Sequence, residues 1–196
     1  MNLAPLRLVV ALVALVLAGV VLGLVLFDRG GAPPSQPAPP APVSRNLGQW
    51  QPATARGEPV ALDFLDGAGV ARSLADWRGR VVLVNVWATW CAPCVEEMPA
   101  LDRIAARLGG AEFDVVAISV DRQGASVVLP FLGKLGLSRL EPYLDPSNAA
   151  VRVLGAPGLP VSVVLDREGR ELGRVLGAAE WDSPAFEALL RRAIGS

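Results

Sequence analysis

The stretch Val81–Cys94, VVLVNVWATWCAPC, is the part of the sequence from which the fold and the chemistry can be inferred. Its first seven residues are almost entirely apolar, which predicts a strand buried on both faces, as in a parallel sheet. The run ends in Cys91 and Cys94, the only two cysteines of the chain, where a helix is expected to begin. A Cys-x-x-Cys pair between a strand and a helix is the arrangement that a dithiol redox site uses.

The two cysteines are predicted to have different roles. Cys91 precedes the helix, whose N-terminal partial charge and free N–H groups stabilise a thiolate, so we expect it to be the exposed nucleophile. Cys94, one turn further on, is expected to be more buried and to act as the resolving thiol. In thiol–disulfide exchange the Cys91 thiolate attacks a substrate disulfide, and Cys94 then displaces the reduced product. A structural disulfide and a Cu(I)-binding dithiol are the alternative interpretations.

The composition excludes several other kinds of chemistry. The 196 residues include 18 Lys and Arg and 19 Asp and Glu, a net charge of −1, and no basic cluster that would favour a nucleic-acid partner. The chain has no histidine, which excludes histidine-dependent catalysis and histidine metal sites. Two cysteines cannot close a four-ligand zinc site. We therefore expect no metal and no cofactor other than a redox-active disulfide between Cys91 and Cys94.

The N-terminal part of the sequence predicts a membrane anchor. Residues 8–27 carry no charge and would span roughly 30 Å as a helix, about the thickness of the hydrocarbon core of a bilayer. A cleaved signal peptide is the alternative, but its apolar region would be about 7–15 residues long and would end at an A-x-A-like site. Residues 1–7 would then form a cytoplasmic N-terminus. Residues 28–46, rich in Pro, Ala and Gly, are expected to form an extended linker before a folded domain at residues 47–196.

Hydrophobic patterns within residues 47–196 predict an α/β domain. After a short helical turn at residues 73–77 and the central strand at residues 81–87, helices and strands alternate. We expect further strands at residues 60–65, 113–120, 161–165 and 171–176, and helices after Cys94, at residues 125–135 with an interruption near Pro130, at residues 146–154, and from Ser183 onward. This order predicts a sheet covered by helices, with additional N-terminal strands.

Several segments of this domain resemble a known family. The block RGRVVLVNVWATWCAPC, the turn Gly158-Leu159-Pro160 and the closing hairpin and helix are similar to thioredoxins, and more narrowly to membrane-anchored TlpA/ResA-type thiol–disulfide oxidoreductases. The stretches GLPVSVVLDREGR and GAAEWDSP look TlpA-like in particular. The resemblance implies a thioredoxin-like α/β fold with a mixed central β-sheet flanked by helices and extra N-terminal strands. It also implies a single-pass protein of the bacterial inner membrane whose C-terminal domain faces the periplasm.

The resemblance implies roles for three further residues. Pro160 matches the cis-proline that lies against the sulfurs and helps to dock the substrate backbone. Trp90 would shield the thiols. Glu97 would lie near the thiols and aid proton transfer, whereas helix periodicity alone favours a solvated surface position. Asn85 stands where cytoplasmic thioredoxins have a buried aspartate, and an amide cannot accept the proton of the resolving thiol, so this role is missing or falls to Glu97.

The function implied by the resemblance is the reduction of selected protein disulfides. Expected substrates are apocytochromes c awaiting haem or copper-site proteins of respiratory oxidases, and the expected electron source is a membrane thiol donor. One alternative is an oxidant that introduces disulfides, and another is a Cu(I)-handling module that uses the same cysteines. Ala92 and Pro93 do not decide the direction of electron flow, because the same fold supports potentials from about −270 to −120 mV.

Overall fold

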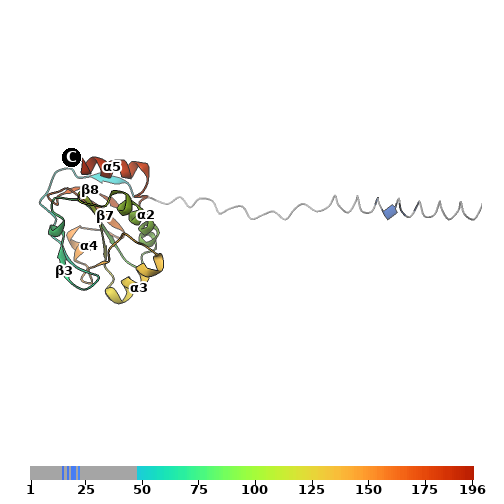
Figure 1. The fold of residues 1–196 in the computed structure, drawn as a ribbon, viewed down its shortest axis with the longest axis horizontal. Helices are drawn as coiled ribbons and strands as arrows, with labels where there is room; N and C mark the ends of the chain where they lie inside the picture. The colour runs from blue at the N-terminus through green and yellow to red at the C-terminus, as the bar shows by residue number, and fades with distance from the viewer. Residues whose placement is uncertain (1–14, 16, 18, 21, 23–47) are drawn as a thin grey trace, which may run out of the picture. The chain divides into compact units, whose positions relative to one another are not determined.

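A computed structural model describes residues 48–196 without a gap and, before them, residues 15, 17, 19, 20 and 22 (Figure 1). Apart from those five residues, the expected anchor at residues 8–27 and the expected linker at residues 28–46 lie outside the described residues. No helix within the described part of the chain is both long enough and apolar enough to cross a membrane. The α/β domain lies within residues 45–196, the second of the two units into which the chain divides.

The α/β domain is built on a mixed eight-stranded sheet with the strand order β1-β8-β7-β4-β5-β6-β2-β3. Strand β4 (Val81–Trp87) lies inside the sheet, parallel to β5 (Phe113–Ser119) and antiparallel to β7 (Val161–Leu165). All seven residues of β4 are buried, and strands β5 and β7 flank it on both edges. The predicted buried strand is confirmed, although only one of its two neighbours is parallel.

The hairpin predicted near the C-terminus is confirmed. Strand β7 is followed by a turn at residues 166–169 and by β8 (Glu171–Leu176), which pairs with β7 in antiparallel orientation. Gly169 has a φ of 76°, a backbone conformation that glycine adopts without a steric penalty. The remaining strands are shorter and lie toward the edges: β1 (Trp50–Pro52), β2 (Asp63–Asp66), β3 (Ala71–Ser73) and β6 (Tyr143–Leu144).

Strands β1 and β6 were not predicted. They have three and two residues, too few for an alternating pattern to be recognised. Strand β1 pairs with β8, and β6 lies between β5 and β2, so long-range main-chain hydrogen bonds define both of them. The strand predicted at residues 60–65 is present as β2, which begins three residues later and pairs with β3 in antiparallel orientation.

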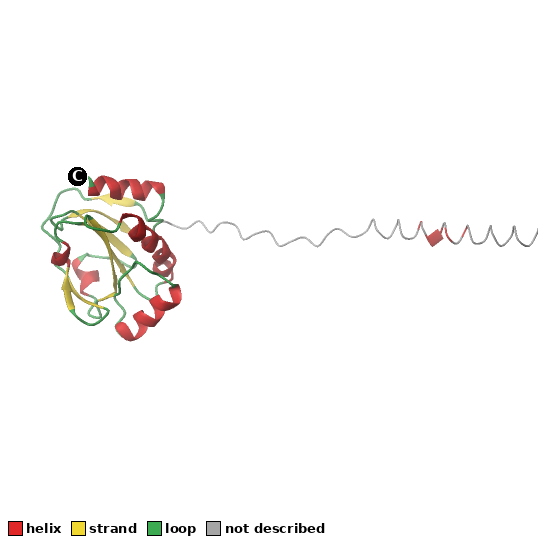
Figure 2. Cartoon of the chain, in the orientation of Figure 1, coloured by secondary structure: helices red, strands yellow, loops and turns green. Residues whose placement is uncertain are grey.

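Helices pack around the strands (Figure 2): the 3₁₀ helix η1 (Leu74–Trp77), α2 (Ala92–Leu108), α3 (Ala125–Leu135), α4 (Ala149–Val153) and α5 (Pro184–Ile194). Arg107 of α2 forms an ion pair with Glu187 of α5 at 3.2 Å, and Arg103 of α2 pairs at 2.6 Å with Asp182, two residues before α5 begins. The predicted start of α5 is confirmed, because the Ser183 hydroxyl accepts a hydrogen bond from a backbone N–H of its first turn.

Two predicted helices differ from the structure. Helix α3 runs through Pro130 without interruption, so the predicted break is wrong; Val128 and Phe131 pack on the core on either side of the proline and stabilise the helix across it. Helix α4 begins at Ala149, three residues later than predicted. The Asp145 carboxylate accepts hydrogen bonds from the backbone N–H groups of Ser147 and Ala150, and these bonds form a turn where the first helical residues were expected.

Candidate redox site

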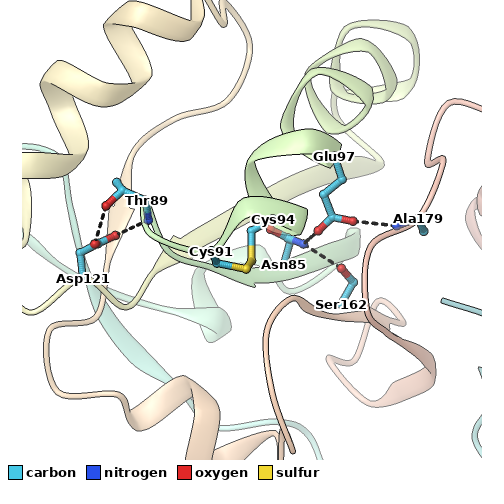
Figure 3. The surroundings of a disulfide bond; sticks show 8 residues. All are labelled: Asn85, Thr89, Cys91, Cys94, Glu97, Asp121, Ser162 and Ala179. Carbon is cyan, nitrogen blue, oxygen red and sulfur yellow. Dashed lines mark hydrogen bonds between the residues drawn. A yellow bond between two sulfur atoms is a disulfide. The ribbon is translucent and has the colours of Figure 1, made fainter. Parts of the chain in front are cut away.

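The two cysteines lie at the junction of β4 and α2. Cys91 is the N-cap residue of α2, Cys94 lies in its first turn, and a disulfide joins them (Figure 3). Cys91 is 7% exposed and Cys94 is fully buried. The predicted order of accessibility is therefore observed, but the oxidised Cys91 is far less exposed than expected. The small exposed surface of the pair therefore belongs to Cys91.

Glu97 belongs to a buried polar cluster that it forms with Asn85, Ser162, Ala179 and Trp181. It lies one turn after Cys94 on α2 and is 3% exposed, which excludes the solvated surface position. The Asn85 Nδ2 donates hydrogen bonds to Glu97 Oε1 at 2.7 Å and to Ser162 Oγ at 2.9 Å. Glu97 Oε2 accepts hydrogen bonds from the Ala179 backbone N–H at 2.9 Å and from Trp181 Nε1 at 3.1 Å. Figure 3 shows the cluster on the Cys94 side of the disulfide.

The environment of Glu97 brings its titration into the neutral range. Burial raises its pKa from 4.5 to about 7, although the hydrogen bonds from Ala179, Asn85 and Trp181 stabilise the carboxylate and oppose this shift. Near pH 7 both the protonated and the ionised forms are therefore well populated. Such a group can take up a proton and release it at little energetic cost, as general acid–base chemistry requires.

A second buried cluster fixes the loop that leads into Cys91. The Asp121 carboxylate is 2% exposed and accepts hydrogen bonds from Thr89 through its backbone N–H at 2.9 Å and its Oγ1 at 2.7 Å. The Ser119 hydroxyl donates a third, at 2.8 Å. In Figure 3 this cluster lies on the opposite side of the disulfide from Glu97. The position of the nucleophile thus depends on a carboxylate that comes from the end of β5.

Four residues of the site were not predicted from the sequence: Thr89, Asp121, Ser162 and Trp181. Thr89 and Asp121 follow the neighbouring parallel strands β4 and β5, whose carboxyl ends meet at one edge of the sheet, so their proximity was inferable from the topology. Ser162 is the one polar residue in the apolar strand β7, and Trp181 lies in the stretch GAAEWDSP that follows β8. Ala179 contributes only a backbone N–H, for which no side-chain signal exists.

Pro160 and Trp90 lie at the same end of the sheet as the disulfide. The Leu159–Pro160 peptide bond is cis, as the resemblance implies. Pro160 immediately precedes Val161, which pairs with Val86 near the end of β4. The Pro160 carbonyl accepts a hydrogen bond from the backbone N–H of Gly177. Trp90 is 71% exposed, so most of its surface faces solvent beside Cys91. The docking role of Pro160 and the shielding role of Trp90 stay predictions.

The site supplies the parts of thiol–disulfide exchange. These are an exchangeable disulfide, a helix N-terminus that stabilises a thiolate, and a buried carboxyl that titrates near neutral pH. Among the described residues no group of three or more His, Cys, Asp or Glu side chains is arranged to hold a metal ion. The sulfurs of Cys91 and Cys94 would become ligands for a soft cation only after reduction of the disulfide.

Comparisons with known proteins find related thiol–disulfide proteins. The chain is 27% identical over 112 residues to the thiol-disulfide oxidoreductase ResA of Bacillus thuringiensis, a match that covers 57% of this chain and 64% of ResA, just under two thirds of its length. It is 31% identical over 138 residues to the thiol:disulfide interchange protein CycY of Rhizobium leguminosarum bv. viciae, covering 70% of this chain and 67% of CycY.

A solved structure supports the same relationship. A candidate DsbE-type thiol:disulfide interchange protein of Chlorobium tepidum superposes with a TM-score of 0.65 at 27% identity, over 73% of this chain and all of that protein. The thioredoxin-like fold expected from the sequence is therefore confirmed. The Redoxin family model matches residues 48–190, a region that includes the disulfide and both buried polar clusters. The chain belongs to the Redoxin family and is a relative of the thiol–disulfide oxidoreductases ResA and CycY.

Proposed function

We propose that this protein is a thiol–disulfide oxidoreductase that reduces disulfides in other proteins through Cys91 and Cys94. The observation that carries the proposal is the position of the disulfide at the start of α2. Its more buried cysteine, Cys94, lies one turn before the buried Glu97 carboxyl, whose pKa is about 7. The similarity to the thiol-disulfide oxidoreductase ResA and the thiol:disulfide interchange protein CycY supports the same reaction class.

The reaction would proceed in two exchange steps. The Cys91 thiolate attacks one sulfur of the substrate disulfide, which breaks, and a mixed disulfide forms while the other substrate sulfur leaves as a thiolate. Cys94 then loses its proton and attacks the Cys91 sulfur, which releases the second substrate thiolate. Two electrons pass to the substrate, and the Cys91–Cys94 disulfide is restored. Glu97 would hold the proton that Cys94 loses, Pro160 would help to dock the substrate backbone beside Cys91, and Trp90 would shield the thiols.

We place this reaction in the periplasm, on a domain attached to the bacterial inner membrane. Residues 8–27 would form the anchor, residues 1–7 would lie in the cytoplasm, and residues 28–46 would hold the domain of residues 47–196 away from the bilayer. The support comes from the uncharged apolar run, the proline-rich composition and the fact that disulfide chemistry persists in oxidising compartments.

We further propose proteins of cytochrome c or copper-oxidase biogenesis as substrates, with a membrane thiol donor supplying electrons. This rests on the resemblance to TlpA/ResA-type proteins. Its test is capture of the mixed disulfide by the full-length Cys94→Ser variant in membranes, since this variant cannot resolve the intermediate. Expected adducts contain a Cys-x-x-Cys haem-binding or copper-binding partner attached to Cys91. The Cys91→Ser variant, which retains only the resolving thiol, is the matched control and should capture far less.

The reduction potential of the Cys91–Cys94 pair distinguishes a protein that reduces substrate disulfides from one that introduces them. Equilibration of the Cys91–Cys94 pair with glutathione should give a value closer to about −270 mV than to about −120 mV. A value near −120 mV would support the oxidant instead. Tight one-to-one binding of Cu(I) by the reduced protein in competition with a chelator, together with no captured adduct, would favour the copper-handling alternative.

A further inference from the structure

One acceptor atom in the buried polar cluster, Asn85 Oδ1, has no hydrogen-bond partner among the described residues. Asn85 is fully buried, and its Oδ1 makes no hydrogen bond in the structure, whereas its Nδ2 donates two. The orientation of the amide follows from those two bonds, because the reverse orientation would place Oδ1 against the carboxylate oxygen of Glu97. Buried polar atoms are nearly always satisfied in folded proteins. An unpartnered buried acceptor calls for an explanation, and a donor that forms in another state of the protein supplies one.

The groups around Asn85 leave one candidate donor. Glu97 accepts a hydrogen bond from the Asn85 amide, and Cys94 lies one turn before Glu97 on the same face of α2. On β7, the Ser162 hydroxyl already accepts a hydrogen bond from Asn85 Nδ2. On β5, the residue opposite Asn85 is Ala117, whose side chain has no donor. In the view of Figure 3, Asn85 is drawn between the disulfide and Ser162. In the oxidised protein the Cys94 sulfur carries no hydrogen and cannot donate.

We propose that in the reduced protein the thiol of Cys94 donates a hydrogen bond to Oδ1 of Asn85, so that this amide connects the resolving thiol to the Glu97 carboxylate. The proposal rests on the proposed function, since it concerns the state that follows reduction. When a dithiol reagent reduces the protein, the Cys91–Cys94 bond breaks and two electrons enter from the reagent, which becomes a disulfide. One of its protons ends on Cys94, Cys91 is left as a thiolate, and the other proton goes to solvent.

The two ends of the amide then have opposite effects on their partners. A hydrogen bond accepted from the Cys94 thiol stabilises its neutral form and raises its pKa, while the bond donated to Glu97 stabilises the carboxylate. Asn85 thus keeps the proton on Cys94 and keeps Glu97 ready to receive it when Cys94 attacks the mixed disulfide. An aspartate at this position could not donate to Glu97 when ionised. Asn85 is in this sense a positioning residue.

The test compares the full-length protein with its Asn85→Leu variant, both reduced with dithiothreitol. Leucine has a similar branched shape but neither donor nor acceptor. Infrared spectroscopy should show the S–H stretch of Cys94, assigned by its loss in Cys94→Ser, at a hydrogen-bonded position in the native protein and at a free-thiol position in Asn85→Leu. Titration of the labelled side chains by NMR should show a pKa shift of about one unit downward for Cys94 and upward for Glu97, a roughly tenfold change in each ionised fraction.

The Ser162→Ala variant is the matched control, because it removes a partner of Nδ2 and leaves Oδ1 intact. Its Cys94 S–H band should stay at the native position. A free-thiol band in the native protein overturns the proposal without recourse to any variant, and so does an unchanged band in a folded Asn85→Leu protein. None of these measurements requires a substrate. A hydrogen-bonded Cys94 with no adduct captured by Cys94→Ser would therefore count against the proposed function and not against this hydrogen bond.

Discussion

Asn85 and Glu97 are joined by a buried hydrogen bond of 2.7 Å that connects the central strand β4 to α2, the helix that begins at the disulfide. Glu97 is in turn held by Ala179 and Trp181, which follow β8. Three separate parts of the chain therefore set the ionisation of one carboxyl group. This arrangement determines how the protein should respond to pH and to substitution around the site.

Replacement of Glu97 by glutamine should reduce the dependence of stability on pH. Burial raises the pKa of Glu97 from 4.5 to about 7, so the folded state binds its proton more tightly than the unfolded state does. This contribution to stability is fully present below about pH 4.5 and is lost as the pH rises through about 7, a change of about 3 kcal/mol. Urea denaturation of the oxidised protein at about pH 4.5 and about pH 8 measures it. An equal loss of stability in wild type and Glu97→Gln would contradict the assignment.

Replacement of Trp181 by phenylalanine should raise the pKa of Glu97 further. The indole N–H donates to Glu97 Oε2 at 3.1 Å and favours the carboxylate, so its loss should add up to about one pKa unit. NMR titration of the Glu97 carboxyl carbon gives the value directly. Trp77→Phe is the control, since it removes a comparable bond from Trp77 Nε1 to Asp114 at 2.8 Å and should leave the pKa of Glu97 unchanged.

Removal of the Asp121 carboxylate should destabilise the protein by about 2–4 kcal/mol, because Asp121→Ala leaves the buried donors of Thr89 and Ser119 without their acceptor. Chemical denaturation measures the loss. Asp102→Ala is a suitable control, because Asp102 also accepts three hydrogen bonds. Its donors are the backbone N–H groups of residues 138–140, which lie near the surface, so water can replace the lost carboxylate. A cost for Asp121→Ala no larger than for Asp102→Ala would show that the Thr89 loop is not held in this way.

Truncation of the central strand should cost more than truncation of an outer one. Leu83 in β4 is fully buried, whereas Leu65 in β2 is 36% exposed. Leu83→Ala should lower the free energy of unfolding by about 2–5 kcal/mol, and Leu65→Ala by less than about 1 kcal/mol. Comparable losses for the two variants, measured in urea, would mean that β4 does not form the centre of the core.

Much of the fold could be predicted because its main elements have local signals. The apolar run of β4, the turn before β8 and the Ser183 cap of α5 each depend on neighbouring residues, and each is confirmed. The predictions that were wrong involve competition between local and distant contacts. Pro130 weakens α3 locally, but the core contacts of Val128 and Phe131 stabilise the helix. The start of α4 is delayed because the Asp145 carboxylate accepts a hydrogen bond from the backbone N–H of Ala150.

The sequence by itself determined the reactive pair. Cys91 and Cys94 are the only cysteines, no histidine competes with them, and their place between a strand and a helix follows from local patterns. Only the tertiary structure decided that Glu97 is buried and that its pKa lies near 7. Its partners Ala179 and Trp181 are 82 and 84 residues away, and no local periodicity encodes contacts at that distance. The electrostatic setting of the thiols is thus a property of the packed domain, because it depends on which distant groups the fold brings against one helix face.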